Sequence, residues 1–233
     1  MSLEIKNIGK KYNNQDALKN VSFSLKKGDI VGFLGPNGAG KTTLMKIITS
    51  TLKQDLGDVI VFGNNTLTND LITKNDIGYL AENNPLYKEM DVNEYLDFIA
   101  SLYKVKNKKE IINSLIIKTG LKDERSKKIE QLSKGFKQRV GIAASLINNP
   151  KVLILDEPTT GLDPNQLIEI RNLIKEIGKD KIVLLSTHIL QEIPKICNHI
   201  IIINNGEIVE NIKMEKLKNS KINLEEHFHK LTT

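Results

Sequence analysis

Short apolar runs alternate with segments of helical periodicity along most of the chain. Residues 3–8 and 21–25 alternate between apolar and polar positions, a pattern typical of half-buried antiparallel strands, with a loop expected at residues 13–17. A further pair of strands is expected around residues 59–62 and 77–80. Continuous apolar runs predict buried strands at residues 29–35, 152–155, 182–186 and 200–203, and Asn-Asn-Gly at residues 204–206 predicts a hairpin.

Residues 91–129 read as a long helical region, because their apolar side chains recur at helical spacing. Strands that alternate with helices predict an α/β fold: a P-loop NTPase core with a mainly parallel sheet, an antiparallel β subdomain and a helical insertion subdomain. The expected organisation is a single domain over residues 1–213, with the insertion at about 85–148 and a short C-terminal tail at 214–233. The residues that carry the helical spacing are Val92, Tyr95, Leu96, Ile99, Leu102 and Tyr103.

Composition narrows the class of protein. The chain has 233 residues, of which 39% are apolar, enough for one large domain with a hydrophobic core. Its longest apolar runs are far too short to cross a bilayer and no signal-peptide pattern opens the chain, so a soluble, unexported protein is expected. The single cysteine, Cys197, excludes an internal disulfide and is interpreted as a small core residue.

The net charge of +6 arises mainly from lysines, which concentrate at residues 104–109 and 122–128. Neither run carries interleaved aromatic residues, the chain has no tryptophan, and no zinc-binding pattern is visible. We therefore interpret these lysines as a solvated surface and expect no nucleic-acid partner.

The first candidate for chemistry is the stretch FLGPNGAGKTTL, whose core at residues 35–42 fits the P-loop pattern of Gly, four residues, then Gly-Lys-Thr. Glycines let backbone N–H groups turn toward phosphate oxygens, and the helix that follows directs its positive end at the same anion. Lys41 is expected to reach the β- and γ-phosphates, and Thr42 to offer its hydroxyl to Mg²⁺. The expected contacts with the nucleotide are Asn37, Gly38, Ala39, Gly40, Lys41, Thr42 and Thr43.

A second candidate is the apolar strand at residues 152–155, which ends in Asp156 and Glu157. A buried strand that terminates in two carboxylates is costly unless both have a role. Beside a P-loop, Asp156 is expected in the Mg²⁺ shell next to Thr42, and Glu157 is expected to accept a proton from the attacking water. An acidic cap on the following turn is the less favoured interpretation.

In a third candidate, Ser133 stands directly before a helical pattern and Gly135 follows two residues later. Alone, Ser133 fits an ordinary helix N-cap. A serine and a glycine at a helix N-terminus also form an anion site suited to a γ-phosphate. Beside the other two motifs, the anion site becomes the favoured interpretation.

Together the motifs resemble the ATP-binding subunit of an ABC transporter, and the likeness runs from about residue 3 to about residue 212. Residues 35–43 are similar to the Walker A loop. Residues 132–136 resemble the family signature, and residues 152–157 resemble the Walker B strand. The likeness implies that ATP and Mg²⁺ are bound, with the antiparallel strands beside the nucleotide.

Three further residues carry the same resemblance. Asp163 lies in a segment similar to the D-loop, His188 is similar to the switch histidine, and Tyr12 resembles the aromatic residue that stacks on adenine. Taken singly, Tyr12 is more often an ordinary packed tyrosine and His188 a plain strand-end histidine. The order of the motifs favours the functional interpretation of both, with His188 steadying the γ-phosphate.

Residues 77–96 most resemble the sequences of ABC-2 type exporters, and within them those of the bacterial gliding-motility-associated subunits. Glu82 stands where most ABC subunits have glutamine, which replaces an amide by a charged group without a donor, although it keeps an oxygen ligand for Mg²⁺. Glu82 is therefore expected both in the metal shell and in catalysis. Lys134 and Phe136 replace the first glycine and the glutamine of the signature, and a positive φ is less comfortable for lysine than for glycine.

The resemblance implies an ATP-hydrolysing subunit that powers a membrane exporter. Two such subunits, identical or closely related, are expected to sandwich two ATP molecules, because Ser133 and Gly135 of one chain complete the site formed by Lys41 of the other. The subunit is then expected at the cytoplasmic face of the cell membrane. There it docks on a separate permease through the turn at residues 85–87 and the helix that follows.

Other functions remain as alternatives. A soluble ABC-type ATPase that acts on a nucleic-acid or ribosomal partner usually carries paired ATPase domains, long coiled coils or zinc motifs, and none is visible. A nucleotide-binding regulator without turnover is disfavoured by the intact Asp156 and Glu157. A P-loop GTPase is weaker still, because the Asn-Lys-x-Asp motif is missing.

Overall fold

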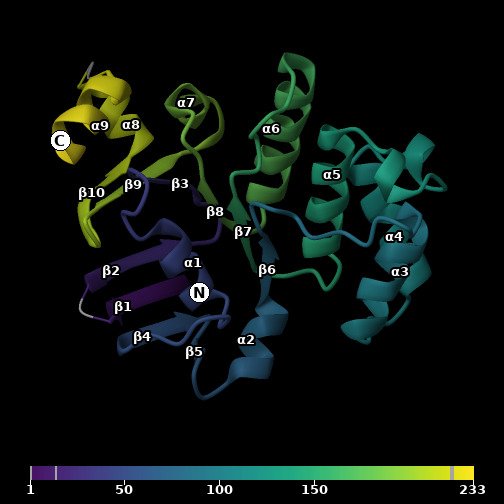
Figure 1. Cartoon of the computed structure of the whole chain (residues 1–233), viewed down its shortest axis with the longest axis horizontal. Coiled ribbons are helices and arrows are strands. Elements are labelled where there is room, and N and C mark those ends of the chain that lie inside the picture. The colour runs from purple at the N-terminus through teal and green to yellow at the C-terminus, as the bar shows by residue number, and fades with distance from the viewer. Residues whose placement is uncertain (1, 14, 221–222) are drawn as a thin grey trace.

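The computed structural model describes residues 2–13, 15–220 and 223–233, which form two β-sheets and the helices that surround them (Figure 1). The strands are β1 (Ser2–Tyr12), β2 (Gln15–Lys26), β3 (Ile30–Leu34), β4 (Leu56–Val61), β5 (Asn64–Asn65), β6 (Ile77–Leu80), β7 (Val152–Asp156), β8 (Ile182–Ser186), β9 (His199–Asn204) and β10 (Glu207–Lys213). The helices are α1 (Lys41–Ile48), α2 (Asp70–Asp76), α3 (Val92–Leu102), α4 (Lys108–Lys118), α5 (Lys134–Ser145), α6 (Pro164–Gly178), α7 (Ile193–Ile196), α8 (Met214–Asn219) and α9 (Leu224–Thr232).

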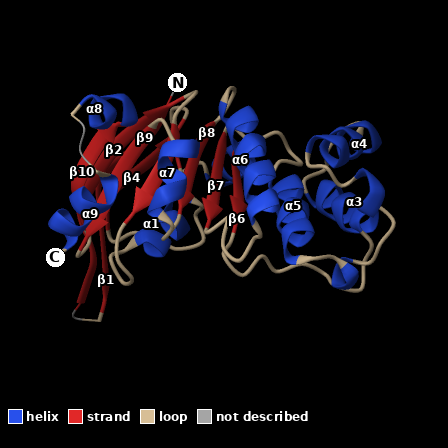
Figure 2. Ribbon diagram, turned by 90° about the horizontal axis from the view of Figure 1, so that it is seen from above, coloured by secondary structure: helices blue, strands red, loops and turns tan. Residues whose placement is uncertain are grey.

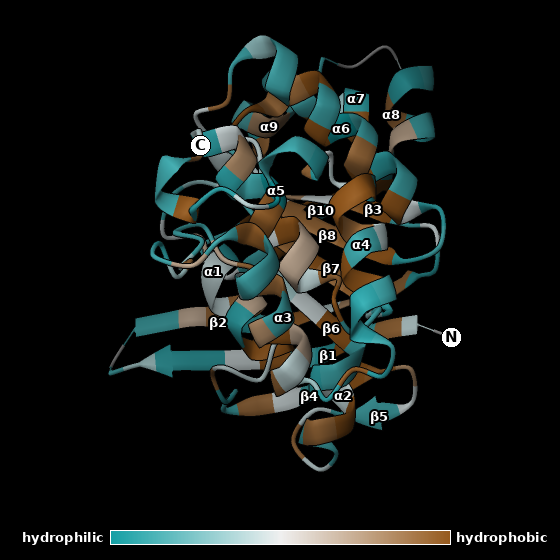
Figure 3. Ribbon diagram, turned by 90° about the vertical axis from the view of Figure 1, so that its right-hand side faces the viewer, coloured by the Kyte–Doolittle hydropathy of each residue, from teal (hydrophilic) through white to brown (hydrophobic). Residues whose placement is uncertain are grey.

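The larger sheet has six strands in the order β10-β9-β3-β8-β7-β6. All neighbouring pairs are parallel except β9 and β10, which form the hairpin predicted at residues 204–206. Every residue of β3, β7 and β8 is buried, as expected for parallel strands covered on both faces. Figure 3 shows β3 and β8 as hydrophobic strands in the interior. The mainly parallel α/β core predicted from the sequence is confirmed.

The smaller sheet is antiparallel, with the order β2-β1-β4-β5. One face of it packs in a common hydrophobic core with α1 and one face of the larger sheet. Leu44, Met45, Ile47 and Ile48 of α1 are all buried there, which accounts for the apolar stripe that follows the P-loop. The helix that follows the P-loop is thereby packed against both sheets.

The opposite face of the larger sheet is covered by α5, α6 and α7, which share a second core with α3 and α4. Figures 1 and 2 show α3 and α4 at the end of the molecule farthest from the antiparallel sheet. All of these helices except α6 and α7 lie between β6 and β7 in the chain. They occupy the part of the sequence in which the helical insertion was predicted.

Two expectations about the strands were wrong. The segments at residues 59–62 and 77–80 do not pair, because β4 joins β1 in the antiparallel sheet, whereas β6 joins β7 in the parallel one, with α2 between them. The loop expected at residues 13–17 is also shorter, since residues 15–17 continue β2 and pair with the end of β1. Polar side chains are tolerated there because this end of the hairpin is largely exposed. Asn14 lies outside the described residues.

The single long helical region expected at residues 91–129 is divided. Asp91 caps the start of α3 in a capping box that includes Glu94. The helix ends before Lys104 and Asn107, whose φ angles of 51° and 53° are left-handed. After α4, the chain continues through short 3₁₀ turns at Lys122–Glu124 and Ile129–Gln131. An apolar stripe gives the spacing within each helix, but it does not show where the backbone turns.

The segment at residues 214–233 contains α8 and α9. Met214, Leu217 and Leu224 are buried in the same core as α6 and α7. Cys197 is buried too, and this burial raises the pKa of its thiol. Within the described parts of the chain, no helix combines the length and the apolar character needed to span a bilayer.

Candidate nucleotide-binding site

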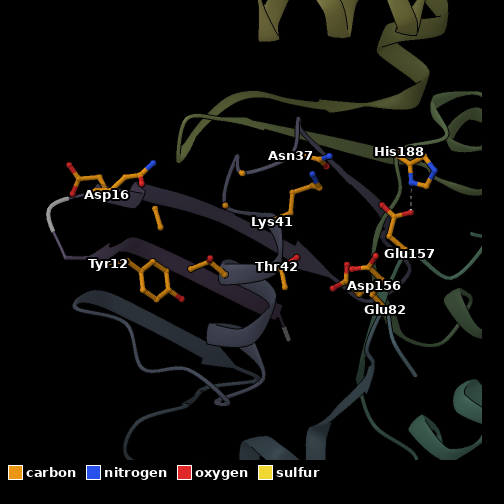
Figure 4. A pocket seen from close by; sticks show the side chains of 14 residues that line it. Tyr12, Asp16, Asn37, Lys41, Thr42, Glu82, Asp156, Glu157 and His188 are labelled. Atoms are coloured by element: carbon orange, nitrogen blue, oxygen red, sulfur yellow. Dashed lines mark hydrogen bonds and ion pairs between the residues drawn. The ribbon is translucent and has the colours of Figure 1, made fainter. Parts of the chain in front are cut away.

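An elongated cavity of about 740 Å³ lies between the P-loop, the end of β1 and the carboxyl ends of β6, β7 and β8. Figure 4 shows Tyr12 and Asp16 at one end, Lys41 and Thr42 in the middle, and the carboxylates with His188 at the other end. The lining residues are Tyr12, Gln15, Asp16, Ala17, Asn37, Gly38, Gly40, Lys41, Thr42, Thr43, Glu82, Asp156, Glu157 and His188. Segments that are far apart in the sequence therefore meet in one cavity.

The P-loop adopts a conformation that depends on glycine at two positions. Gly38 and Gly40 have φ angles of 80° and 108°, which favour glycine because other residues rarely adopt them. A Cβ on Gly40 would lie 2.6 Å from the Ala17 carbonyl oxygen, so this glycine also permits close approach to β2. Gly40 is the N-cap of α1, and the unpaired N–H groups of the first turn open toward the cavity.

The ammonium group of Lys41 lies against the loop itself. Its Nζ donates to the carbonyl oxygens of Gly35 at 2.6 Å and Pro36 at 3.0 Å. Burial lowers the pKa of Lys41, while the charges of Glu157 and Asp156 oppose that shift. The cation is therefore set among backbone dipoles and two nearby carboxylates, in a position suited to a phosphate.

Asp156 ends β7 and is only 3% exposed. Its Oδ1 accepts a hydrogen bond of 2.5 Å from the buried Ser186 hydroxyl on β8. Burial and the charges of Asp156 and Glu82 raise the pKa of Tyr79 on β6 to about 12, so this hydroxyl stays protonated beside the carboxylates. Asp156 is thus surrounded by neutral donors on the sheet and faces the cavity beside Thr42 (Figure 4).

Glu157 is held more tightly than a free acidic side chain. Its φ of 52° lies in the left-handed region, which a non-glycine residue seldom occupies without a structural or functional reason. Its Oε2 accepts from the Thr160 hydroxyl at 2.9 Å and lies 2.8 Å from His188 Nδ1. The carboxylate is thereby directed to the end of the cavity where the ring of His188 extends (Figure 4).

Glu82 follows β6 and lines the cavity close to Asp156 in Figure 4. The two residues that follow it, Asn83 and Asn84, also carry side-chain oxygens of a kind that binds Mg²⁺. Asn84 instead donates its amide to the Lys137 carbonyl of α5 at 2.8 Å and packs against Gly141. Of these three side chains, only Glu82 lines the cavity.

The cavity fits a magnesium nucleotide. Among the described residues, no group of three or more His, Cys, Asp or Glu side chains forms a preassembled metal cage. Magnesium in phosphate-transfer sites is usually bound through one or two carboxylates together with phosphate oxygens and water. The oxygen donors of Thr42, Asp156 and Glu82 provide such a partial set beside the P-loop.

Tyr12 lies at the opposite end of the cavity from Glu157 and is 47% exposed. Tyr12 is therefore not a core residue. Among the described residues, the only cation close to its ring is Lys10, whose Nζ lies 5.9 Å from the ring centre. Gln15, Asp16 and Ala17 line the same end. Sequence reasoning missed these three because it assigned them to a loop.

Four predicted site residues do not line the cavity. Ala39 belongs to the P-loop but is buried. Ser133 caps α5 by accepting from Phe136 N at 3.4 Å, and Asp163 caps α6 by accepting from Gln166 N at 2.9 Å. A Cβ on Gly135 would lie 2.5 Å from the Gln166 side chain, so the starts of α5 and α6 pack together. Ser133, Gly135 and Asp163 thus form a second group on the same chain, separate from the cavity.

The signature motif lies at the regular start of α5. Lys134 is the first residue of α5 and is not among the residues with positive φ, so its replacement of glycine requires no left-handed backbone. Its side chain packs against Gly161, where a Cβ would lie 2.3 Å from Nζ. The backbone donors at the start of α5 are therefore present in a regular helix.

Tyr79, Thr160 and Ser186 were also not predicted as site residues. Ser186 and Tyr79 lie on buried strands next to β7, and their hydroxyls approach Asp156 only because the strands are neighbours in the sheet. Thr160 is three residues after Glu157, a spacing that permits the local hydrogen bond. Only this last contact had a signal in the sequence.

Comparisons with known proteins agree with this geometry. A family model described as "ABC transporter" matches residues 18–160. The lantibiotic transport ATP-binding protein SrtF of Streptococcus pyogenes is 37% identical over 228 residues, which cover 97% of this chain and 96% of SrtF. The bacitracin transport ATP-binding protein BcrA of Bacillus licheniformis is 37% identical over 213 residues, or 91% of this chain and 69% of BcrA.

Solved structures extend the comparison to the whole fold. An ATP-binding subunit of an ABC transporter matches with a TM-score of 0.89 and 28% identity, covering 100% of both chains. An ATP-binding cassette solved as a dimer with ADP and Pi in a post-hydrolysis state matches with a TM-score of 0.81 and 28% identity, over 91% of this chain and 98% of that one. The family model spans more than half of the chain, and the relatives span nearly all of it. The resemblance predicted from the motifs is therefore confirmed: the chain belongs to the ABC transporter family, as an ATP-binding subunit whose hydrolysis of ATP powers a membrane transporter.

Proposed function

We propose that the chain is the Mg²⁺-dependent ATPase subunit of an ABC-2 type exporter, working as a dimer on a separate permease at the cytoplasmic face of the membrane. The observation that carries the proposal is the order of groups along the cavity. Tyr12 stands at one end, the P-loop with Lys41 lies in the middle, and Glu157 stands at the other end. This order follows the length of ATP from base to γ-phosphate.

In this proposal, the P-loop amides and Lys41 neutralise the phosphate charge, and the ring of Tyr12 stacks on adenine. Thr42, Asp156 and Glu82 hold Mg²⁺. When bound, the ion would neutralise part of the phosphate charge. The protein contributes mainly position and electrostatic stabilisation, which is what phosphoryl transfer requires.

Glu157 is assigned the role of proton acceptor for the attacking water. Its Oε2 is already engaged with Thr160 and His188, which orients the carboxylate toward the open end of the cavity. His188 is assigned the γ-phosphate, since its side chain lines this end of the cavity and is 65% exposed. Glu157 and His188 follow the carboxyl ends of β7 and β8, which position both side chains.

The dimer follows from the separation of the two groups of site residues. Ser133, Gly135 and Asp163 do not line the cavity that contains Lys41, so they are assigned to the site of a second ATP-binding subunit, identical to this one or closely related. In the first turn of α5, the Phe136 N–H is bonded to Ser133, and the N–H groups of Lys134 and Gly135 are the donors assigned to an anion. The dimeric relative with ADP and Pi supports this arrangement.

The proposed permease surface lies beside β6, where a second cavity of about 830 Å³ is lined mainly by apolar and aromatic side chains. It includes Pro85, and Leu102 of α3 lines it with 63% of its surface exposed. Tyr87 is exposed nearby on the turn before α3. Exposed apolar groups around a cavity are typical of an interaction surface. The names of SrtF and BcrA, which refer to lantibiotic and bacitracin transport, support the proposal of an exporter.

Affinity purification of the tagged chain from detergent-solubilised membranes tests this proposal. We expect a polytopic membrane protein to co-purify and the complex to hydrolyse ATP only with Mg²⁺. Leu102→Glu should weaken the association, whereas the matched control Ile117→Glu should keep it, because Ile117 is similarly exposed on α4 but does not line the cavity. Recovery with ribosomes or DNA instead would contradict the proposal and favour the soluble alternative.

A further inference from the structure

Ser186 is the last residue of β8 and is completely buried beneath the nucleotide cavity. The parallel ladder between β7 and β8 ends at this point, with Asp156 opposite Ser186. Ser186 is not one of the residues that line the cavity. Any effect it has on ATP must therefore pass through its neighbours.

Both neighbours of the Ser186 hydroxyl belong to the carboxylate pair. Its Oγ donates to Asp156 Oδ1 at 2.5 Å and accepts from the backbone N–H of Glu157 at 3.0 Å. A hydroxyl has one proton to donate, so the bond to the carboxylate fixes its direction and leaves a lone pair for the amide. The short bond to a charged acceptor is of the stronger kind.

These two bonds have different consequences. The Ser186 bond is made to Oδ1 of Asp156, so Oδ2 is the carboxylate oxygen that this bond leaves for another ligand. Glu157 is the residue with a φ of 52°, and the bond to its N–H holds the peptide plane that precedes this unusual conformation. The direction in which the Glu157 side chain leaves the backbone depends on that plane.

We propose that Ser186 is a positioning residue for both carboxylates: it presents Asp156 Oδ2 to the metal, and it fixes the backbone from which Glu157 reaches the attacking water. This inference rests on the proposed function, which assigns Asp156 to Mg²⁺ and Glu157 to proton transfer. The hydroxyl itself touches neither nucleotide nor metal.

The test compares the full chain with Ser186→Ala and with Ser145→Ala. Ser145 is a matched control, because it is also buried and its hydroxyl donates within α5, to Ile142 O at 2.7 Å. Mn²⁺ affinity in the presence of a non-hydrolysable ATP analogue is measured by electron paramagnetic resonance. ATP affinity in EDTA and the ATP hydrolysis rate are measured on the same samples.

Ser186→Ala should weaken Mn²⁺ binding and slow hydrolysis, each about 10- to 100-fold, because a hydrogen bond to a charged group is lost. ATP affinity in EDTA should stay within about twofold, since the P-loop is untouched. Ser145→Ala should match the parent in all three measurements. Ser186→Thr, which keeps the hydroxyl, should recover most of the metal affinity.

Mn²⁺ affinity of Ser186→Ala equal to that of the parent would overturn the inference. So would a Ser186→Thr chain that is as stable as the parent and yet binds Mn²⁺ as weakly as the alanine variant. If the alanine chain does not fold, Ser186→Cys provides the same comparison with a weaker donor. A parent chain that hydrolyses no ATP with Mg²⁺ contradicts the proposed function itself, whereas an active parent with unaffected Ser186 variants contradicts only this inference.

Discussion

At the scale of single residues, Glu157 combines a left-handed backbone with a side chain bonded to Thr160 and His188. Glu157→Gln keeps the volume and leaves the P-loop unchanged, but it removes the proton acceptor. We expect ATP to bind with nearly parental affinity while turnover falls about 10²- to 10⁴-fold. Phosphate release and retention of labelled ATP measure the two effects. Turnover close to that of the parent would remove Glu157 from the role of base.

Tyr12 offers a second prediction at this scale. The ring is about half exposed, so Tyr12→Ala should change the free energy of unfolding by less than about 0.5 kcal/mol. Loss of stacking on adenine should weaken ATP binding by about 1 to 3 kcal/mol and leave the rate at saturating ATP unchanged. Calorimetric titration and thermal unfolding on one sample separate the two effects. Lower stability with unchanged affinity would show that the ring only packs.

Glu82 is the third residue-scale case, because it replaces a neutral amide by a charge. Glu82→Gln should keep substantial ATPase activity, while Glu82→Ala should raise the Mg²⁺ concentration needed for half-maximal rate, since one oxygen ligand is lost. Asn84→Ala is the control, because the Asn84 amide bonds to α5 instead of lining the cavity. Mg²⁺ titrations of the rate decide between them. A shifted Mg²⁺ dependence in Asn84→Ala, with none in Glu82→Ala, would exclude Glu82 from the metal shell.

At the scale of elements, β6 and α5 approach each other closely at Gly78. A Cβ there would lie 2.1 Å from the Ser145 carbonyl oxygen, which belongs to the backbone and has little freedom to move. Gly78→Ala should lower the free energy of unfolding by about 1 to 3 kcal/mol, measured by urea denaturation. Gly9→Ala is the control, because the atoms nearest to its Cβ would belong to the exposed Leu56 side chain, the nearest of them at 3.2 Å. Equal losses in both variants would contradict the proposed contact between β6 and α5.

Element types were predicted better than element partners. The buried runs that became β3, β7, β8 and β9 were read correctly, because parallel strands covered on both faces are apolar throughout. The partner predicted for β6 was wrong, because neither β4 nor β6 carries a local signal for the sheet that it joins. The break between α3 and α4 was not predicted, because Lys104 and Asn107 indicate a turn less strongly than glycine or proline does.

At the scale of the whole molecule, the proposed composite site predicts complementation between defective chains. Lys41→Ala should lose ATP affinity and rate, since a charge-assisted contact worth about 1.5 to 3 kcal/mol disappears. Ser133→Glu should also be inactive, because it places a carboxylate where a phosphate is expected. In a two-fold dimer, a mixed pair of these chains retains one intact site. Mixing should therefore produce ATPase activity that neither chain shows alone. Failure to recover activity, although mixed dimers form, would indicate that each site is built from one chain.

The sequence alone determined the chemistry that is local along the chain. The P-loop glycines and Lys41 lie within a few residues of one another, and the two carboxylates at the end of β7 are adjacent, so spacing and residue type within each motif were enough to predict a nucleotide site. The family resemblance rested on the same short motifs and their order. The mainly parallel sheet followed from apolar runs that alternate with helical segments.

Only the tertiary structure decided which distant residues complete the site. Tyr12 lines the same cavity as the P-loop because the antiparallel sheet and α1 share a hydrophobic core, and Ser186 reaches Asp156 because β8 is the neighbour of β7. Ser133 and Asp163 come together at the starts of two helices, away from Lys41. Sequence patterns report the burial and local conformation of each segment. Contacts between segments depend on strand order and packing, which arise from the free energy of the whole chain.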